Sequence, residues 1–276
     1  RCGTLHVNPM PGAAALSAHY QDPAYFSGAA AQGYRSYADM EQALRPHFQR
    51  RLRLLGQLVP GRGRLLDFGC AAGYFLRQAR AAGWQIAGVE VAAGMAQAAA
   101  EALGIPIASS LAESPARDLQ AVTLWEVIEH LPQPVEVLRE LRQRLLRRGV
   151  LLLSTPNTGL WQAIRRPEAW AGYRPPAHVL FFTAQTLALA LERAGFERIA
   201  VQRTMPLPPL PAWLEALSAP LQAGLADGRA RPWRLALWTW RAIRVLGWGW
   251  ARLAHPSDEV YATLEAAAFR PAEGRA

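Results

Sequence analysis

The stretch Leu65-Leu-Asp-Phe-Gly-Cys-Ala-Ala-Gly73 decides the fold of this chain. It is a short apolar run that enters a turn with glycines at 69 and 73, and a helix-like stretch, Tyr74 to Ala82, follows it. A second apolar run, Gln85 to Val89, ends at the acidic residue Glu90. Glycine has no Cβ and lets a backbone approach a ligand, and a carboxylate that closes the second strand is placed to accept both hydroxyls of a ribose. The segment therefore predicts a nucleoside site.

The glycine spacing separates two kinds of nucleoside site. A dinucleotide fingerprint needs glycines at 69, 71 and 74, and the chain has Ala71 and Tyr74 instead. The segment instead resembles the first motif of the class I S-adenosylmethionine-dependent methyltransferases. In that family the glycine turn wraps the methionine part of the methyl donor, and the acid at the position of Glu90 binds the ribose. Alanine replaces the usual middle glycine at Ala71, and we expect the turn to survive with slightly less room.

Strands and helices alternate along the rest of the chain, which predicts a parallel, doubly wound sheet. In the family the last strand pairs antiparallel with its predecessor, so the resemblance implies a Rossmann-like, seven-stranded sheet. Gly104, Gly149 and Gly195 stand where helices should stop. The expected strands are 64–68, 85–90, 105–108, 121–126, 149–154, 196–203 and 259–264, and the expected helices are 74–82, 93–103, 134–147 and 184–194.

Four parts are expected along the chain, which is long enough for one large α/β domain and an appendage. Residues 1–58 hold a loose lid, 11–37, and an amphipathic helix, 39–58. The methyltransferase core follows at 59–204. A Pro/Trp/Arg-rich helical insertion, with a helix at 233–254, occupies 205–257. The final strand and tail are 258–276.

The N-terminus carries a second, shorter resemblance. The chain starts at Arg1 rather than Met, and we expect that residues precede it. Cys2-Gly3 and Asn8-Pro9 resemble the end of a zinc ribbon that some of these methyltransferases carry. One cysteine cannot build a four-ligand zinc site, so a truncated ribbon and a lone terminal cysteine are both open interpretations. With Cys70 as the second of two cysteines, a disulfide framework is not expected and a reducing cytosol is.

The stretch Ala121 to Leu131, Ala-Val-Thr-Leu-Trp-Glu-Val-Ile-Glu-His-Leu, again resembles the family, at the strand end where the acceptor meets the donor. Ser154-Thr-Pro-Asn157 and a later segment with His178 extend the match to a branch of quinone-biosynthesis O-methyltransferases and glycan or lipid tailoring methyltransferases. The resemblance covers roughly residues 35 to 203, and Ser109-Ser110 replaces its commoner acidic contact. It implies that the donor is bound by Asp67, Gly69, Cys70, Gly73, Glu90, Val91, Ser110 and Trp125.

Glu126, Glu129 and His130 are candidate catalytic residues. Their spacing of i, i+3 and i+4 puts them on one face if the chain turns helical there. Together with His178 they could coordinate a divalent ion, as a similar Glu-x-x-Glu-His plus a later histidine does in small-RNA 2′-O-methyltransferases. Without a metal, His130 could be the general base. The third interpretation is structural, with Glu129 and His130 capping the next helix.

The charge of the chain bears on its partners. Its net charge is +9, and all 30 basic residues are arginine. The absence of lysine is typical of codon bias, so the charge is weak evidence for nucleic acid, although a basic surface attracts anionic lipid or an acidic substrate. Arginines on one side of 229–254 and five tryptophans suit a helix in a membrane interface. The alternative is a helix packed over the active site or at a dimer contact, and the oligomeric state is left open. No transmembrane span is expected.

These observations predict a cytoplasmic enzyme, peripheral to the inner face of a membrane if 229–254 binds there. It would transfer a methyl group from S-adenosyl-L-methionine to an oxygen of a small-molecule, saccharide or lipid-like acceptor. Tyr34, Tyr37, Trp161 and Trp170 are candidate walls of the closed site or ordinary packing residues. The competing functions are an RNA 2′-O-methyltransferase, which the lack of an RNA-binding module disfavours, and a non-catalytic nucleoside-binding scaffold.

Overall fold

The computed structural model describes residues 3–22, 37–207, 209–226, 233–254 and 256–272. The chain divides into two compact units. The first unit comprises Arg1–Pro156, Arg174–Gln202 and Leu264–Ala276, and the second comprises Asn157–Tyr173 and Arg203–Thr263. The second unit thus combines two separate parts of the sequence. The four predicted boundaries follow the sequence alone and stay a prediction.

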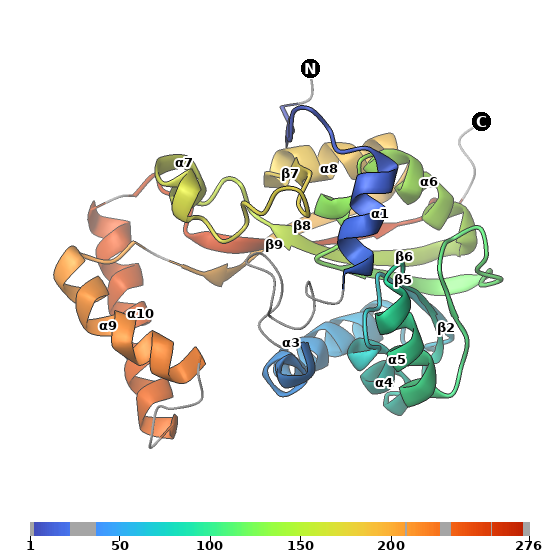
Figure 1. The fold of residues 1–276 in the computed structure, drawn as a ribbon, viewed down its shortest axis with the longest axis horizontal. Helices are drawn as coiled ribbons and strands as arrows, with labels where there is room; N and C mark the ends of the chain where they lie inside the picture. The colour runs from blue at the N-terminus through green and yellow to red at the C-terminus, as the bar shows by residue number, and fades with distance from the viewer. Residues whose placement is uncertain (1–2, 23–36, 208, 227–232, 255, 273–276) are drawn as a thin grey trace. The chain divides into compact units, whose positions relative to one another are not determined.

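A seven-stranded sheet forms the centre of the fold, with strand order β4-β3-β2-β5-β6-β9-β8 (Figure 1). Strands β2 to β6 pair in parallel, and the last strands run antiparallel. The predicted Rossmann-like sheet is therefore confirmed. Its strands are β2 (Arg64–Phe68), β3 (Gln85–Val89), β4 (Ile107–Ala108), β5 (Leu119–Trp125), β6 (Leu145–Pro156), β8 (Glu197–Pro206) and β9 (Tyr261–Phe269).

Apolar side chains fill both faces of the sheet because neighbouring residues of a strand point to opposite sides. In β2, Leu65 and Leu66 are both fully buried but belong to different core clusters. Val122 joins Leu66 in one cluster, and Ala121 joins Leu65 in the other. A sheet buried on both faces needs helices on both sides, which is the doubly wound arrangement.

The helices of the first unit supply the outer layers. Phe75 and Leu76 of α4 lie in the cluster of Leu65, whereas Leu138 of α6 and Leu187 of α8 lie in the cluster of Leu66. The two layers therefore cover opposite faces of the sheet. The helices are α3 (Tyr37–Leu58), α4 (Tyr74–Ala81), α5 (Ala93–Leu103), α6 (Pro134–Arg144) and α8 (Ala184–Arg193).

One helix end differs from its prediction. Helix α6 ends at Arg144 and β6 begins at Leu145, so residues 145–147 are strand rather than helix, and Gly149 is not a helix stop. Leu145 is buried and pairs with Leu119, with a register shift that follows this pair. Burial in the sheet therefore outweighs the helical pattern. The other two predictions are confirmed, because Gly104 and Gly195 follow helices with φ of +61° and +84°.

The N-terminal segment is more ordered than predicted. Residues Ala13–Gln21 form helix α1, so the prediction of a loose lid is wrong there. Strand β1 (Leu5–His6) pairs antiparallel with β7 (Leu180–Phe181). Residues 23–36, within the predicted lid, lie outside the described residues, as does Cys2, and the zinc-ribbon interpretation stays a prediction.

In the described part of the second unit there are two short helical turns and two longer helices. Helix α10 (Trp233–Ala254) has the bounds predicted from the sequence. Helix α9 (Ala212–Ala226) was not predicted, because its sequence contains Pro220 and follows a proline-rich run, although the helix continues through this proline. The short elements are α7 (Trp161–Arg165) and η2 (Pro167–Ala169). Among the described residues, no helix is both long and apolar enough to cross a membrane.

Candidate functional site

A cavity of about 630 Å³ opens at the carboxyl ends of the parallel strands. This volume falls within the range of small-molecule sites. Four segments contribute most of its wall: α1, the turn after β2, the end of β3, and the turn after β5. In an open α/β sheet this edge is where ligands bind.

The cavity collects many of the predicted site residues, although not all. Those that line it are Gly69, Glu90, Val91, Ser110, Trp125, Glu126 and His130. The predicted residues that do not line it are Asp67, Cys70, Gly73, Glu129 and His178. Asp67, Cys70 and Gly73 lie beside the lining residues along the chain, and Glu129 and His178 lie beside the lining residue His130.

The turn after β2 takes left-handed backbone angles at three residues. Gly69, Ala71 and Gly73 have φ of +78°, +45° and +77°. A Cβ on Gly69 would meet Cγ2 of Val127 at 2.5 Å, and one on Gly73 would meet Cδ1 of Leu103 at 2.8 Å. Both glycines are therefore required by the backbone and by internal packing. Ala71 takes a conformation that costs an L-residue roughly 1–2 kcal/mol.

Glu90 is the anchor of this turn. Its Oε2 accepts a hydrogen bond from the Ala71 N–H and its Oε1 accepts one from the Ala92 N–H, each at 2.8 Å. Burial raises the pKa of Glu90, and the hydrogen bonds from the backbone oppose that rise. The carboxylate is thus fixed at the cavity wall, at the end of β3.

Asp67 and Cys70 lie beneath the turn. The Thr123 hydroxyl donates to Oδ1 of Asp67 at 2.6 Å, and burial raises the pKa of Asp67 to about 7. Burial also raises the pKa of the Cys70 thiol, which makes it a poor nucleophile. The Cys70 Sγ lies beside Gly88, where a Cβ would come within 2.9 Å of it. Both side chains face the protein interior.

The turn after β5 carries the predicted catalytic residues. Ile128–His130 form a single 3-10 turn, η1, preceded by Glu126 with φ of +56°. The helical turn contains Glu129 and His130 but not Glu126, so the prediction that all three lie on one helical face is wrong for Glu126. Glu126 and His130 reach the cavity, whereas Glu129 is buried.

His130 is held through one ring nitrogen. Its Nδ1 lies 2.9 Å from the Ala177 carbonyl oxygen and 2.9 Å from the Tyr20 hydroxyl, which itself donates to the same carbonyl at 3.0 Å. A carbonyl only accepts, so this contact places the proton on Nδ1 and leaves Nε2 as the basic nitrogen. Burial and the neighbouring His178 lower the pKa of His130 to about 3. The imidazole is neutral at physiological pH.

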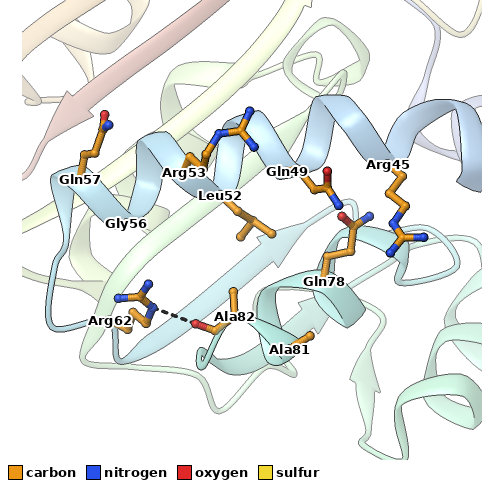
Figure 2. A pocket seen from close by; sticks show the side chains of 10 residues that line it. All are labelled: Arg45, Gln49, Leu52, Arg53, Gly56, Gln57, Arg62, Gln78, Ala81 and Ala82. Atoms are coloured by element: carbon orange, nitrogen blue, oxygen red, sulfur yellow. Dashed lines mark hydrogen bonds between the residues drawn. The ribbon is translucent and has the colours of Figure 1, made fainter.

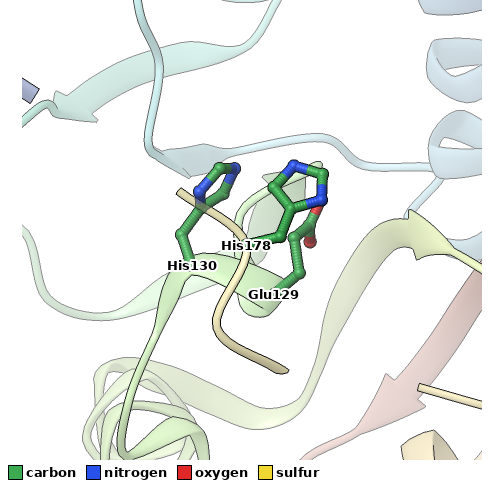
Figure 3. A group of neighbouring side chains, drawn as sticks. All are labelled: Glu129, His130 and His178. Atoms are coloured by element: carbon green, nitrogen blue, oxygen red, sulfur yellow. The ribbon is translucent and has the colours of Figure 1, made fainter. Parts of the chain in front are cut away.

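Glu129, His130 and His178 form a compact group (Figure 3). One ligand atom from each lies within 4.8 Å of the others. Oε2 of Glu129 accepts from the Thr155 hydroxyl at 2.9 Å, while its buried Oε1 has no hydrogen-bond partner among the described residues. Burial and the nearby Glu126 raise the pKa of Glu129 well above its ordinary value. Glu126, the fourth predicted ligand, is outside this group.

Helix α1 contributes residues that the sequence did not single out. Leu16, Ser17 and Tyr20 line the cavity. Gln21 donates to the Val91 carbonyl at 2.7 Å and accepts from the Ala93 N–H at 3.1 Å. The helix therefore contacts both the end of β3 and His130. A helical signal was missing because the segment is rich in small residues and weakly amphipathic.

Arg51 of α3 is a second residue that the sequence did not reveal. It is buried, donates to Glu265 at 3.1 Å and to the Ser154 hydroxyl at 3.0 Å, and its guanidinium lies 4.2 Å from the centre of the Trp125 ring. These contacts fix the cavity residue Trp125 from behind. Only the amphipathic pattern of 39–58 hinted at a buried position here.

Of the four predicted wall residues, Trp161 and Trp170 are described and neither lines the cavity. Trp161 and Trp170 belong to the second unit, where the Trp161 indole donates to the Leu207 carbonyl at 2.7 Å. This hydrogen bond supports the packing interpretation of Trp161, which stays a prediction. Tyr34 and the side chain of Tyr37 lie outside the described residues.

A second cavity of about 600 Å³ lies between α3 and α4 (Figure 2). None of the predicted site residues lines it. Its walls carry arginine and glutamine side chains and no carboxylate: Arg45, Gln49, Leu52, Arg53, Gly56, Gln57, Arg62, Gln78, Ala81 and Ala82. The two cavities therefore differ in the sign of their charge.

Comparison with known proteins adds to this geometry. A family model described as "Methyltransferase domain" matches residues 37–201. No curated protein matches the chain. Among solved structures, a SAM-dependent methyltransferase from Archaeoglobus fulgidus is similar with a TM-score of 0.57 and 18% identity, over 90% of this chain and 100% of that one.

Two further structures are similar in fold. Phosphoethanolamine N-methyltransferase 2 from Haemonchus contortus, in complex with S-adenosyl-L-methionine, gives a TM-score of 0.53 at 18% identity. The match covers 81% of this chain but 52% of that protein, about half its length. A possible histamine N-methyltransferase from Thermotoga maritima gives 0.53 at 17% identity, over 85% and 94% of the two chains.

Proposed function

The chain belongs to the class I S-adenosylmethionine-dependent methyltransferases, and on that premise we propose that it methylates an oxygen of a saccharide or lipid-like small molecule. S-adenosyl-L-methionine supplies an activated methyl group that needs placement rather than further activation. The observation that carries the proposal is the single cavity in which Glu90 and His130 both take part.

We assign the donor to the side of the cavity formed by the turn after β2. Glu90 stands at the end of β3, where a carboxylate can accept from ribose hydroxyls. Gly69 and Ala71 offer backbone beside it, and Val91, Ser110 and Trp125 line the adjoining wall. Asp67, Cys70 and Gly73 are positioning residues in this proposal, because they shape the turn from below.

Charge supports this cavity over the arginine-lined one. The sulfonium of the donor is a cation, and the carboxylates Glu90, Glu126 and Glu140 line the proposed cavity. The cavity between α3 and α4 presents Arg45, Arg53 and Arg62 instead. Like charges repel at short range, so the donor should avoid that second cavity.

His130 is the proposed general base. It reaches the cavity, and its Nδ1 is fixed by the Ala177 carbonyl. Its neutral Nε2 would take the proton of an acceptor hydroxyl while the oxygen–methyl bond forms and the sulfur–methyl bond of the donor breaks, which leaves S-adenosylhomocysteine as the second product. Tyr20 is a positioning residue, because its hydroxyl contacts Nδ1. Glu126 lies on the same wall and can orient the acceptor hydroxyl.

The test uses tritium-labelled donor and the lipid and saccharide fractions of a cell extract as acceptors. His130→Ala should lower methyl transfer by about 100-fold or more, while its affinity for S-adenosylhomocysteine stays that of the wild type. Tyr20→Phe should lower transfer to a smaller degree, again with unchanged affinity. Transfer at the wild-type rate by His130→Ala would contradict the proposed base.

A divalent metal is the second candidate for this step. One carboxylate and two imidazoles are a donor set that suits a transition metal, and the unpartnered Oε1 of Glu129 fits a nearby cation. Glu129, His130 and His178 would hold the metal, which would lower the pKa of the acceptor hydroxyl. Loss of transfer on treatment with EDTA, with recovery on adding metal, favours this candidate. An unchanged rate rejects it, and Glu129→Ala should then keep most of the activity.

A lipid-like acceptor also implies where in the cell the enzyme acts. We propose that the enzyme acts at the inner face of a membrane, with residues 229–254 as the contact. The many arginines and tryptophans of this segment support the proposal.

A further inference from the structure

The second unit exposes an unusual set of large apolar side chains on α9 and α10. Trp213 and Leu217 of α9 are exposed, as are seven large apolar residues of α10. The most exposed are Leu253 at 87%, Val245 at 69% and Trp238 at 68%. The exposed residues of α10 are Leu235, Trp238, Val245, Leu246, Trp248, Trp250 and Leu253. Soluble proteins rarely expose a contiguous patch of this kind unless it binds something.

Of the four buried residues described in the same helices, three are small. Gly247 and Ala251 of α10 are buried, one helical turn apart, and Leu214 and Ser218 are the buried positions of α9. The two helices pack against each other (Figure 1). Apart from Leu214, the described buried residues are small and the large apolar residues are exposed, which is the reverse of the order in a water-exposed helix pair.

The exposed apolar residues of α10 form a stripe. At about 100° per residue, Leu235, Trp238, Val245, Leu246 and Leu253 fall in a sector of about 100°. Arg241 and Arg252 lie together along one edge of that sector and are exposed. An apolar stripe with an arginine edge is the pattern of a helix that lies in the plane of a bilayer surface.

Charge indicates which surface the stripe meets. Six arginines and no acidic residue occur between Gly228 and Ser257. The guanidinium of Arg244 lies 4.9 Å from the Trp240 ring centre, and that of Arg252 lies 5.2 Å from Trp248. Arginine held over tryptophan keeps an aromatic and a cation together, which suits the headgroup level of a membrane. A protein partner of mixed charge would not require this excess.

We infer that α9 and α10 form a docking surface for an anionic lipid bilayer, with the stripe of α10 inserted at the headgroup boundary and the arginines on lipid phosphates. This inference rests on the proposed function in one respect: membrane binding would give the enzyme access to a lipid-like acceptor. Neither helix crosses the bilayer, in keeping with the absence of a spanning helix among the described residues.

The test is co-sedimentation of the full chain with vesicles of phosphatidylcholine, with and without phosphatidylglycerol. The wild type should bind the anionic vesicles more tightly, and less so as salt rises. Trp238→Ser combined with Leu246→Ser should weaken binding by about tenfold or more. Arg241→Glu combined with Arg252→Glu should abolish the preference for phosphatidylglycerol.

The control is Ile164→Ser, which removes an apolar side chain that is 69% exposed on α7 of the same unit. It should leave vesicle binding unchanged. The inference is overturned if the wild type does not sediment, or if Ile164→Ser weakens binding as much as the double variant. It is also overturned if gel filtration shows a dimer that the Trp238→Ser/Leu246→Ser variant breaks, because the occupant is then a second copy of the chain.

Affinity for S-adenosylhomocysteine, measured on the same preparations, separates this inference from the proposed function. If vesicle binding is absent but S-adenosylhomocysteine still binds, the inference about the lipid surface is wrong and the proposed function is not. If S-adenosylhomocysteine does not bind but vesicles do, the proposed function is wrong and the inference about the lipid surface is not.

Discussion

At the scale of single residues, Ala71 shows what a sequence motif predicts and what it does not. The sequence predicted a turn that survives the loss of the middle glycine, and the turn does form, with φ of +45° at Ala71. The Ala71 N–H bond to Glu90 keeps the residue in this left-handed conformation. What a motif cannot convey is the strain, because strain depends on the backbone angle.

Ala71→Gly should therefore stabilise the protein. Relief of the left-handed strain should raise the free energy of unfolding by about 1 kcal/mol, measured by chemical denaturation. The matched control is Ala98→Gly, at an exposed position inside α5, which should lose about 1 kcal/mol. Equal losses for the two variants would contradict the strain.

Asp67 should make stability depend on pH. Its pKa rises from 3.8 to about 7 on folding, so the folded protein holds this proton more tightly than the unfolded chain does. The free energy of unfolding should therefore fall as pH rises from about 4 to about 7, by up to about 4 kcal/mol from this group.

The measurement is urea denaturation of ligand-free wild type and Asp67→Asn across this range. Because His130 contributes in the opposite direction, the difference between the two proteins isolates Asp67. As pH rises toward 7, the free energy of unfolding of Asp67→Asn should increase relative to that of the wild type. A difference that is constant with pH would show that Asp67 ionises normally.

At the scale of elements, sequence patterns predicted strands and helices well where apolar runs and turn residues agree. The bounds of β2, α5 and α10 match their predictions. Sequence patterns failed where tertiary contacts determine the secondary structure, as at the end of α6, where Leu145 joins the sheet. They also failed for α1, whose position depends on contacts of Tyr20 and Gln21 with segments far along the chain.

The packing between the turn after β2 and the turn after β5 is an element-scale feature of the site. Gly69 leaves no room for a Cβ because Val127 fills that space. Gly69→Ala should lower the free energy of unfolding by about 2 kcal/mol or more, from left-handed strain and from the clash.

Val127→Ala provides the test of this contact. It removes the two methyl groups that a new Cβ would meet at 2.5 and 3.2 Å, and leaves Val127 Cβ at an ordinary 3.5 Å. The double variant should therefore lose less stability than the sum of the single variants, by thermal or chemical unfolding. Strict additivity would mean that the two turns do not press on each other.

At the scale of the whole molecule, the sequence predicted a parallel, doubly wound sheet. It also predicted at which edge of the sheet the ligand site lies, because parallel strands bring their carboxyl ends together. The sequence further predicted that Glu126, Glu129 and His130 meet the distant His178, which the structure bears out for Glu129 and His130 but not for Glu126. It could not predict that Trp161 and Trp170 belong to a second unit, since a unit built from 157–173 and 203–263 is defined by contacts and not by continuity.

The central claim is that this chain binds the methyl donor through Glu90, and calorimetric titration with S-adenosylhomocysteine tests it most directly. The wild type should bind one molecule, and Glu90→Gln should bind about tenfold more weakly or worse, because a carboxylate that accepts from hydroxyls is replaced by an amide. Glu101→Gln, the same change on the surface of α5, should bind as the wild type does. No binding by the wild type, or equal affinity of Glu90→Gln and wild type, would contradict the account.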